Sequence, residues 1–320
     1  MSPFISIYIP AYKNEFYLQK LLDSIVLQTW KDFEVIISDD SPNLDVANLV
    51  DRYRDKLKSI HYCHNRPAKG MPANWNFAIK MCRGEWLKIM HDDDWFTESD
   101  SLEKFANAAK LSNAKFIFSA YQNIQLNTGA LDSSKRLSAL WKKQLEQEPL
   151  ILMSSNVIGP PSVTMVHRSL SDVYDERLRW RVDLDYYIRI LRQTRFVYLD
   201  EILVNIGMSD IQITQEVKYQ KQVELPEAMI ILEKYGLASF RNIIVFDSWW
   251  RLLRNLGVRG FKDTSSYVDS DKWPEIIRRM INAQSKIPVS ILKNGLFSKL
   301  WMTWNYNQLV KRKKLERNWK

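Results

Sequence analysis

The stretch EWLKIMHDDD, residues 85–94, joins a run of apolar residues to three consecutive aspartates. Its apolar part is short and contains large side chains, which predicts a buried β-strand that ends at the carboxylates. Three adjacent like charges repel, and the end of a strand does not require them. Either solvent offsets this cost, if the run is an exposed loop, or a divalent cation does so, since hard cations bind carboxylate oxygens.

The neighbouring sequence places this strand in an alternating series of strands and helices. Further buried strands are predicted at residues 4–12, 33–40, 59–65 and 115–124. Apolar residues at helical spacing predict helices at residues 16–29, 44–57, 72–82 and 101–111. Strands and helices that alternate in this way form a mostly parallel sheet through right-handed crossovers. The sequence therefore predicts an α/β fold, a Rossmann-like sheet flanked by helices.

Acidic residues follow two of these strands directly. Asp39 and Asp40 end the segment 33–40, and the three aspartates 92–94 end the segment 85–94. Ligands of open α/β sheets bind outside the carboxyl ends of the strands. We therefore expect both acidic groups to meet in one crevice. The absence of G-x-G-x-x-G and Walker A patterns excludes a dinucleotide fold of the usual kind and a P-loop protein.

The positive charge of the chain is concentrated in its C-terminal third. The 320 residues are 46% apolar and 26% charged, which is typical of a globular protein with one large or two smaller domains. Residues 215–320 contain 20 Lys+Arg against 10 Asp+Glu, whereas residues 1–214 contain 26 against 27. This asymmetry indicates an anionic partner surface. No nucleic-acid recognition motif accompanies the charge, so we expect a membrane surface and no nucleic acid.

Residues 215–320 are predicted to be helical. The segment 288–304 has an apolar stripe of Leu292, Leu296, Phe297, Leu300, Trp301 and Trp304. A basic tail, residues 311–320, follows it. An apolar, Trp-rich face beside lysines is typical of a helix that lies in a membrane interface, and a basic tail adds attraction to anionic lipid. The alternative is a helix packed on its own core beside a solvated tail, which we expect for residues 243–257.

Three absences in the sequence bear on the compartment. Cys63 and Cys82 fit no disulfide framework or zinc spacing. No secretory signal and no apolar run of about 18 residues is present. We therefore expect a cytoplasmic protein that binds peripherally to the inner face of the cytoplasmic membrane.

Several segments resemble a known family. ISIYIPAYKNE, VIISDDSP and GMPANWNFAIKMCRGEWLKIMHDDDW resemble the N-terminal half of family 2 glycosyltransferases of the GT-A fold, of the type that builds bacterial cell-surface glycans. PPSVTMVHRSL and RWRVDLDYYIRIL resemble the acceptor-side half of that family. The resemblance implies a GT-A domain at 1–214, with a nucleotide-sugar-binding half at 1–125 and an acceptor-side half at 126–214. Residues 215–320 then form a helical, basic extension.

The resemblance also implies an activity. Family members are inverting glycosyltransferases, so the chain would be a hexosyltransferase that uses a nucleotide-sugar donor, with a UDP-sugar favoured. The acceptor would be a glycan or a lipid-linked saccharide in polysaccharide biosynthesis. The cofactor would be Mn²⁺ or Mg²⁺.

The same resemblance assigns donor-binding residues. They are Pro10, Tyr12, Glu15, Asp40, Asn74 and Asp93. Pro10, Tyr12 and Glu15 would line the nucleobase pocket, with Tyr12 against the ring, and Asp40 would accept a hydrogen bond from the base. Asn74 has a second interpretation, as a polar residue at a helix N-terminus next to a core tryptophan, Trp75.

The metal ligands implied by the resemblance are Asp93 and Asp94, which match the paired carboxylates of the family's D-x-D-D pattern. His91 occupies the first position of that pattern in place of an aspartate. Asp92 and Asp94 also form a D-x-D pair. All three aspartates are therefore candidate ligands, and the sequence does not decide which two bind the metal.

An inverting transfer needs a base that removes the proton of the acceptor hydroxyl. The segment RWRVDLDYYIRIL, residues 179–191, offers Asp183 and Asp185 at the start of a helical pattern. The family's E-D-x-D segment aligns with Val182 to Asp185, which implies that Asp183 is the catalytic base. The alternative is that both aspartates only stabilise the helix N-terminus.

Two other classes of protein compete with this interpretation. A nucleotidyltransferase that makes nucleotide sugars usually has a glycine-rich phosphate loop after its first strand, and IPAYKNE contains no glycine. A non-catalytic nucleotide-sugar-binding protein would bind the donor without turnover, so replacement of Asp183 distinguishes it from an enzyme.

Overall fold

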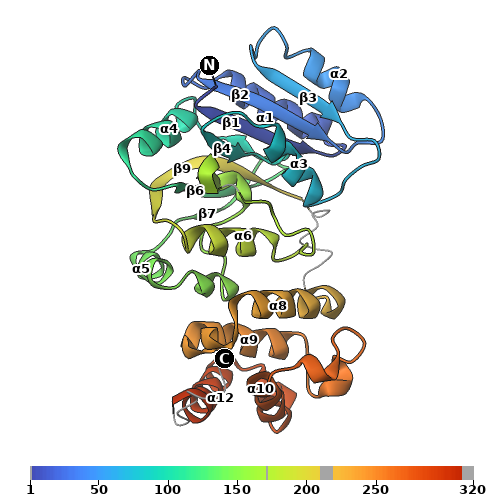
Figure 1. Ribbon diagram of the computed structural model, residues 1–320, viewed down its shortest axis with the longest axis vertical. Coiled ribbons are helices and arrows are strands. Elements are labelled where there is room, and N and C mark those ends of the chain that lie inside the picture. Colours follow the sequence, from blue (N-terminus) through green and yellow to red (C-terminus); the bar gives the residue numbers. More distant parts are fainter. Residues whose placement is uncertain (1, 171, 210–218, 312–320) are drawn as a thin grey trace. The chain divides into compact units, whose positions relative to one another are not determined.

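The computed structural model describes residues 2–170, 172–209 and 219–311. The chain divides into two compact units, Met1–Pro149 with Val157–Gln212 and Leu150–Asn156 with Ile213–Lys320. The first unit is a sheet with flanking helices, and the described part of the second is built from helices (Figure 1). The predicted α/β fold with a helical C-terminal region is therefore confirmed.

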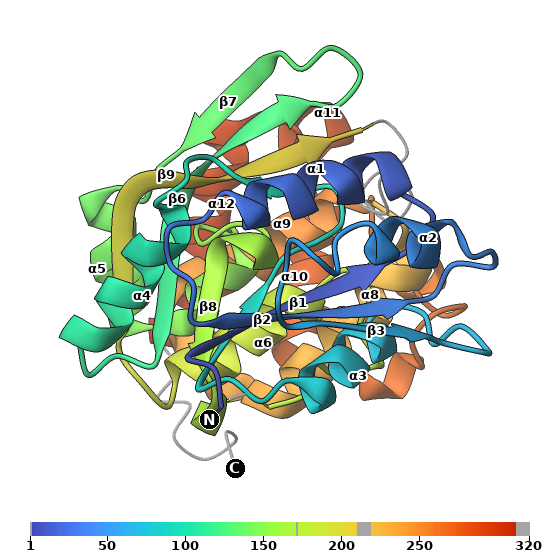
Figure 2. The same cartoon turned by 90° about the horizontal axis from the view of Figure 1, so that it is seen from above.

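The N-terminal half of the first unit alternates strands and helices as the sequence predicts. Its strands are β1 (Ile5–Ala11), β2 (Phe33–Asp39), β3 (Ile60–His64) and β4 (Trp86–Ile89). Its helices are α1 (Glu15–Val26), α2 (Asp45–Asp51) and α3 (Ala73–Met81). These strands pair in parallel in the order β3-β2-β1-β4. Figure 2 shows α1 and α2 on one face of these strands and α3 on the other, which explains why β1 is buried along its whole length.

Two of these elements are shorter than predicted. α2 ends before residue 57 because residues 52–56 form turns. β4 ends at Ile89 and does not reach Asp94. Beyond it, a turn closed by the amide of Asp94 and the carbonyl of His91, 3.1 Å apart, takes the chain out of the sheet. The three aspartates therefore lie in a turn at the carboxyl end of the strand.

The rest of the first unit extends the same sheet. Its strands are β5 (Trp95–Phe96), β6 (Phe116–Gln125), β7 (Leu131–Lys135), β8 (Thr164–His167) and β9 (Phe196–Met208). Its helices are α4 (Ser101–Leu111), α5 (Ala139–Gln147) and α6 (Val182–Leu191). β8 runs antiparallel between β4 and β6, and β6 pairs in parallel with β9. The loop before β8 and the end of β9 are therefore both brought toward the acidic turn.

The second unit is helical in its described part. Its helices are α8 (Lys221–Tyr235), α9 (Ile243–Asn255), α10 (Glu275–Ser285), α11 (Val289–Leu292) and α12 (Gly295–Tyr306). Trp250 of α9 is fully buried and donates from Nε1 to Ser298 Oγ of α12 at 3.1 Å, and Gln284 Nε2 of α10 donates to the carbonyl of Trp250 at 2.9 Å. α9 therefore packs in the core of this unit, as predicted. No helix among the described residues has the length and hydropathy needed to span a membrane.

Candidate active site

The acidic turn after β4 lies beside the end of β1. The backbone amide of Tyr12, one residue after β1, donates to Asp92 Oδ2 at 2.9 Å. At the end of β2, the amide of Asp40 donates to the carbonyl of Ala11 at 3.0 Å. The carboxyl ends of β1, β2 and β4 therefore meet, as expected for a ligand-binding edge of a parallel sheet.

The three aspartates of the turn have different surroundings. Asp92 accepts the bond from Tyr12. Asp94 is buried and accepts a hydrogen bond from the amide of Gly207, at the end of β9, into Oδ1 at 3.0 Å. Asp93 is partly buried, and its backbone carbonyl approaches Gly207 so closely that a Cβ on that glycine would lie 2.2 Å from the carbonyl oxygen. Only a glycine fits there without a shift of the backbone.

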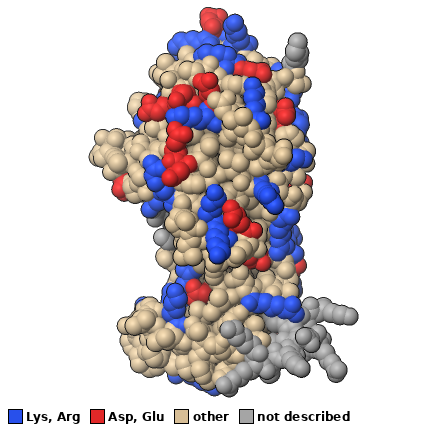
Figure 3. All heavy atoms as spheres, turned by 90° about the vertical axis from the view of Figure 1, so that its left-hand side faces the viewer, with Lys and Arg blue, Asp and Glu red and all other residues tan. Residues whose placement is uncertain are grey.

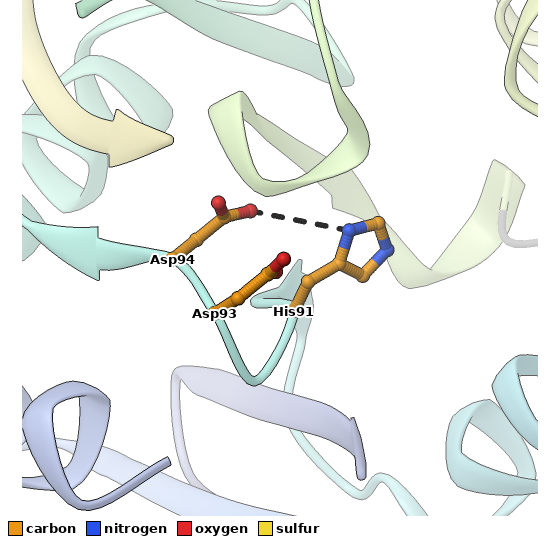
Figure 4. A group of neighbouring side chains, drawn as sticks. All are labelled: His91, Asp93 and Asp94. Carbon is orange, nitrogen blue, oxygen red and sulfur yellow. Dashed lines mark ion pairs between the residues drawn. The ribbon is translucent and has the colours of Figure 1, made fainter. Parts of the chain in front are cut away.

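Three side chains of the turn form a group that fits a metal ion. Candidate ligand atoms of His91, Asp93 and Asp94 all lie within 4.8 Å of one another (Figure 4). That span is near the largest separation, about 4.4 Å, of two ligands that each lie about 2.2 Å from one ion. Burial, and then the charge of Asp93, raise the pKa of Asp92 to about 8, and the same two causes raise the pKa of Asp94. A cation would offset this accumulated negative charge.

His91 is held by its backbone and by packing. Its amide donates to Ser162 Oγ at 2.9 Å, and its ring lies 4.9 Å from the ring of Trp75. Nδ1 lies 3.9 Å from Asp94 Oδ2 (Figure 4), and Nε2 is buried without a hydrogen-bond partner among the described residues. Burial and then the charge of Lys88 lower the pKa of His91 to about 4, so the imidazole is neutral at pH 7.

Two residues that were not predicted from the sequence, Lys88 and Ser162, lie next to this group. Lys88, in β4, is fully buried, and its ammonium donates to the carbonyl of Ser162 and, at 3.3 Å, to the carbonyl of Ile89. Ser162 therefore receives a bond from Lys88 at its carbonyl and from His91 at its hydroxyl, and it also bonds Asp94. Lys88 could have been noticed in the sequence, because it is a charged residue inside an otherwise apolar strand. Nothing in the local sequence indicates a role for Ser162.

Asp40 and Asn74 lie in a second, buried network. Asp40 Oδ1 accepts from Asn65 Nδ2 at 2.8 Å, and Asp40 Oδ2 accepts from the amide of Gly70 at 2.7 Å. Asn74 donates from Nδ2 to the carbonyl of Ser38 at 3.1 Å and accepts from Asn65 Nδ2 at 3.1 Å. These bonds fix the loop at residues 65–70 beside the ends of β2 and β3. They give both residues a positioning role, and direct contact with a base stays a prediction.

Of the three residues predicted to line the nucleobase pocket, Tyr12 and Glu15 are exposed and Pro10 is buried in the sheet. Tyr12 has 54% of its surface exposed, and Glu15, at the start of α1, is exposed. Pro10 is buried within β1, opposite Ser38 of β2. Tyr12 and Glu15 are therefore accessible to a ligand, whereas Pro10 is buried in the strand.

Asp183 and Asp185 differ sharply in their surroundings. Asp185 is fully buried and accepts from Arg189 Nε at 3.0 Å. Asp183 is only partly buried, in the first turn of α6. Burial, and then the nearby charge of Asp183, raise the pKa of Tyr121 in β6 to about 12, which places the Asp183 carboxylate near that phenol. Asp183 is thus the member of the pair that a substrate could reach.

One loop contacts both the acidic turn and Tyr121, the neighbour of Asp183. Gly159 has a φ of +114°, and a Cβ there would lie 2.5 Å from Cε1 of Tyr121. Ser162, three residues later, bonds His91 at the acidic turn. The loop at residues 158–163 therefore lies between the turn after β4 and the aspartate at the start of α6, so both carboxylate groups border one region of the first unit.

A mostly parallel α/β sheet with an acidic turn at its carboxyl edge and a partly exposed carboxylate beside it is the architecture of the GT-A class of glycosyltransferases. The family model of glycosyl transferase family 2 matches residues 6–174, and the chain belongs to this family. The family assignment from the sequence is therefore confirmed, and the protein is a glycosyltransferase.

Individual relatives with low sequence identity to this chain are also named as glycosyltransferases or polysaccharide synthases. An uncharacterized glycosyltransferase of Rickettsia typhi is 26% identical over 84% of this chain and 83% of its own length. The hyaluronan synthase of Pasteurella multocida is 22% identical over 96% of this chain, but the match spans only 31% of that synthase. The chondroitin synthase of Escherichia coli is 24% identical over 63% of this chain and 29% of its own length.

Solved structures confirm the fold. S. aureus TarS 1-349 in complex with UDP-GlcNAc superposes with a TM-score of 0.63 at 17% identity, over 97% of this chain and 91% of that one. The mannosyltransferase PcManGT of Pyrobaculum calidifontis, in complex with GDP-Man and Mn²⁺, superposes with a TM-score of 0.54 at 13% identity, over 98% of this chain and 89% of that one.

Proposed function

We propose that this glycosyltransferase is metal-dependent and inverting, and that it transfers a hexose from a UDP-sugar to a glycan or lipid-linked acceptor in the synthesis of a cell-surface polysaccharide. The observation that carries this proposal is the group His91, Asp93 and Asp94, which lies beside the end of β1 where Tyr12 is exposed. Similarity to a structure with UDP-GlcNAc and to polysaccharide synthases supports the choice of donor and acceptor.

Different residues of the chain have different roles in the proposed reaction. Tyr12, Glu15 and the network around Asp40 hold the nucleotide, and Asp183 removes the proton of the acceptor hydroxyl as the new bond forms. Asp93 and Asp94, with His91, hold the cation. When bound, a divalent cation neutralises charge on the departing diphosphate.

A nucleotide-sugar panel tests the proposal. Chelator-treated protein should be stabilised by a UDP-sugar plus Mn²⁺ and much less by GDP- or dTDP-sugars, because a ligand at 100 times its dissociation constant adds about 2.7 kcal/mol to the free energy of unfolding. Differential scanning fluorimetry measures the shift. An equal response to all three nucleotide classes, or none to UDP-sugars, would contradict the choice of donor.

We further propose that the second unit binds the inner face of the cytoplasmic membrane through α11 and α12. Leu296, Leu300 and Trp304 repeat at intervals of four residues, and 74%, 63% and 50% of their surfaces are exposed. The residues of α12 that are buried are Ser298, Met302, Asn305 and Tyr306, and Leu292 of the predicted stripe is buried as well, which corrects that part of the prediction. Leu296, Leu300 and Trp304 therefore form an exposed apolar stripe that is not used for the unit's own core.

Charge around the stripe favours an anionic lipid surface. Lys286, Lys293 and Lys299 are exposed near it. On the side of the second unit seen in Figure 3, most described atoms are uncharged. The basic segment 312–320 lies outside the described residues, so its part in the contact rests on its composition. Basic residues near an anionic surface contribute about 1 kcal/mol each.

Liposome binding tests the membrane proposal. The triple variant Leu296→Gln, Leu300→Gln and Trp304→Gln should weaken binding to anionic vesicles on the order of tenfold or more, because it removes most of the apolar area that the bilayer would bury. Co-sedimentation with phosphatidylglycerol vesicles at low and high salt measures it. The matched control is Leu111→Gln, at an exposed leucine of α4. Equal binding by parent, triple variant and control would exclude the stripe.

A further inference from the structure

A group of tyrosines lies near the start of α6. Asp183 and Tyr187 are four residues apart in this helix, which puts them on the same side of it. The hydroxyl of Tyr187 donates to the carbonyl of Gly159 at 3.1 Å, and Gly159 in turn packs on the ring of Tyr121 in β6. The carboxylate of Asp183 and the ring of Tyr121 are therefore brought together around Gly159.

The charge of Asp183 acts on three phenols. Burial is the largest cause that raises the pKa of Tyr121, Tyr174 and Tyr187, and the carboxylate of Asp183 raises the pKa of each of them further. The pKa of Tyr121 rises to about 12, so its hydroxyl keeps its proton at neutral pH and acts as a hydrogen-bond donor. All three hydroxyls thus lie within electrostatic reach of the proposed base.

The three hydroxyls differ in their partners. Tyr187 bonds Gly159, and the hydroxyl of Tyr174 lies 3.5 Å from that of Tyr8. Tyr121 is only partly buried, and its hydroxyl has no hydrogen-bond partner among the described residues. Its ring is closely packed, because a Cβ on Gly159 would lie 2.5 Å from Cε1 and 3.1 Å from Cζ. The protein therefore fixes the ring of Tyr121 beside the base and leaves its hydroxyl for a ligand.

We propose that Tyr121 binds the acceptor, and that its hydroxyl donates a hydrogen bond to an acceptor oxygen next to the hydroxyl that Asp183 deprotonates. The inference rests on the role of Asp183 proposed above. A bond to the attacking oxygen itself would occupy a lone pair and weaken that oxygen as a nucleophile, so the neighbouring oxygen is the partner that helps the transfer. The site then selects acceptors with two adjacent oxygens, as in a saccharide, over acceptors with a single hydroxyl.

The transfer step leaves Tyr121 unchanged. The attacking oxygen forms a bond to the anomeric carbon of the donor, the bond from that carbon to the diphosphate breaks, and the released proton goes to Asp183. Tyr121 keeps its own proton and contributes the orientation of the acceptor. Water has no neighbouring oxygen, so hydrolysis of the donor should not depend on Tyr121.

The experiment uses the full chain with Mn²⁺, with UDP-GlcNAc and UDP-glucose as donors, and with two acceptor probes of the same ring size, trans-1,2-cyclohexanediol and cyclohexanol. Mass spectrometry measures the transfer to each probe, and release of UDP without a probe measures hydrolysis. The parent protein should prefer the diol. Tyr121→Phe should lower the ratio of diol to cyclohexanol transfer about threefold to tenfold, the usual worth of one hydrogen bond between neutral groups. Hydrolysis and donor affinity should stay unchanged.

Tyr198→Phe is the matched control. The hydroxyl of Tyr198, in β9, donates to Asp200 at 2.9 Å and accepts from the amide of Leu137 at 2.9 Å, so this variant also removes one phenol hydroxyl. It should change neither the ratio nor hydrolysis. An unchanged ratio in Tyr121→Phe would overturn the inference. An equal loss of hydrolysis and transfer in that variant would also overturn it, because such a loss indicates a structural role.

The outcomes distinguish this inference from the proposed function. Hydrolysis of either donor without transfer to the diol would overturn the role of Tyr121 and leave the proposed donor intact. Absence of any turnover of the two UDP-sugars would count against the proposed function, and saturation-transfer NMR with the same two probes then decides the inference. A diol signal that is weaker in Tyr121→Phe than in the parent would support the inference, and equal signals would overturn it.

Discussion

The variant Asp183→Asn is expected to fold normally, to bind the nucleotide donor with unchanged affinity and to lose about 10²–10⁴-fold in kcat, because removal of a general base costs that factor. The carboxylate of Asp183 is partly exposed near Tyr121, and asparagine has nearly the same shape but does not accept a proton. Single-turnover transfer assays and donor titrations on the same preparation measure the two quantities separately.

Asp185 provides a matched control, because its replacement should lower the stability of the protein. Asp185 is fully buried against Arg189, so Asp185→Asn should remove a buried ion pair. Loss of one partner of such a pair costs several kcal/mol, which corresponds to a fall in Tm on the order of 5 °C. If Asp183→Asn remains as active as the parent across pH, the base is another residue. If instead it loses stability like Asp185→Asn, its role is structural.

The sequence was sufficient for the order and type of the elements that build the site. Apolar segments that end in carboxylates predicted that β2 and β4 would present their acids at one edge, and the bond between Tyr12 and Asp92 joins that edge to β1. Such features are local, since they depend on periodicity and on the direction of parallel strands. For the same reason, the family could be inferred from the order of short motifs.

Contacts between residues far apart in the chain could not be predicted. Ser162 bonds His91, 71 positions earlier, and Gly207 bonds Asp94, 113 positions earlier. Neither residue type at these positions implies the contact, because each depends on how β8 and β9 join the sheet. The inclusion of residues 150–156 in the second unit also depends on tertiary packing. Sequence reasoning therefore found the acids but not the residues that orient them.

Replacement of Asp94 by asparagine should have the largest effect on the donor site. Asparagine keeps an oxygen that can accept the hydrogen bond from the amide of Gly207, so the turn should remain in place. It removes the negative charge that a cation needs, so we expect weaker Mn²⁺ binding, weaker metal-dependent UDP binding and a loss of at least about 10²-fold in turnover. Calorimetric titration of UDP with and without Mn²⁺ measures the first two effects.

Asp92→Asn is the control that decides which aspartates bind the metal. Asp92 directs one oxygen at the amide of Tyr12 and is outside the group formed by His91, Asp93 and Asp94. Its neutral variant should therefore retain metal-dependent UDP binding far better than Asp94→Asn does. Normal turnover of Asp94→Asn after chelator treatment and restoration of Mn²⁺ would contradict the metal role. The three aspartates would then be a solvated acidic turn, since a site that works without the charge of its most buried carboxylate does not depend on a cation held there.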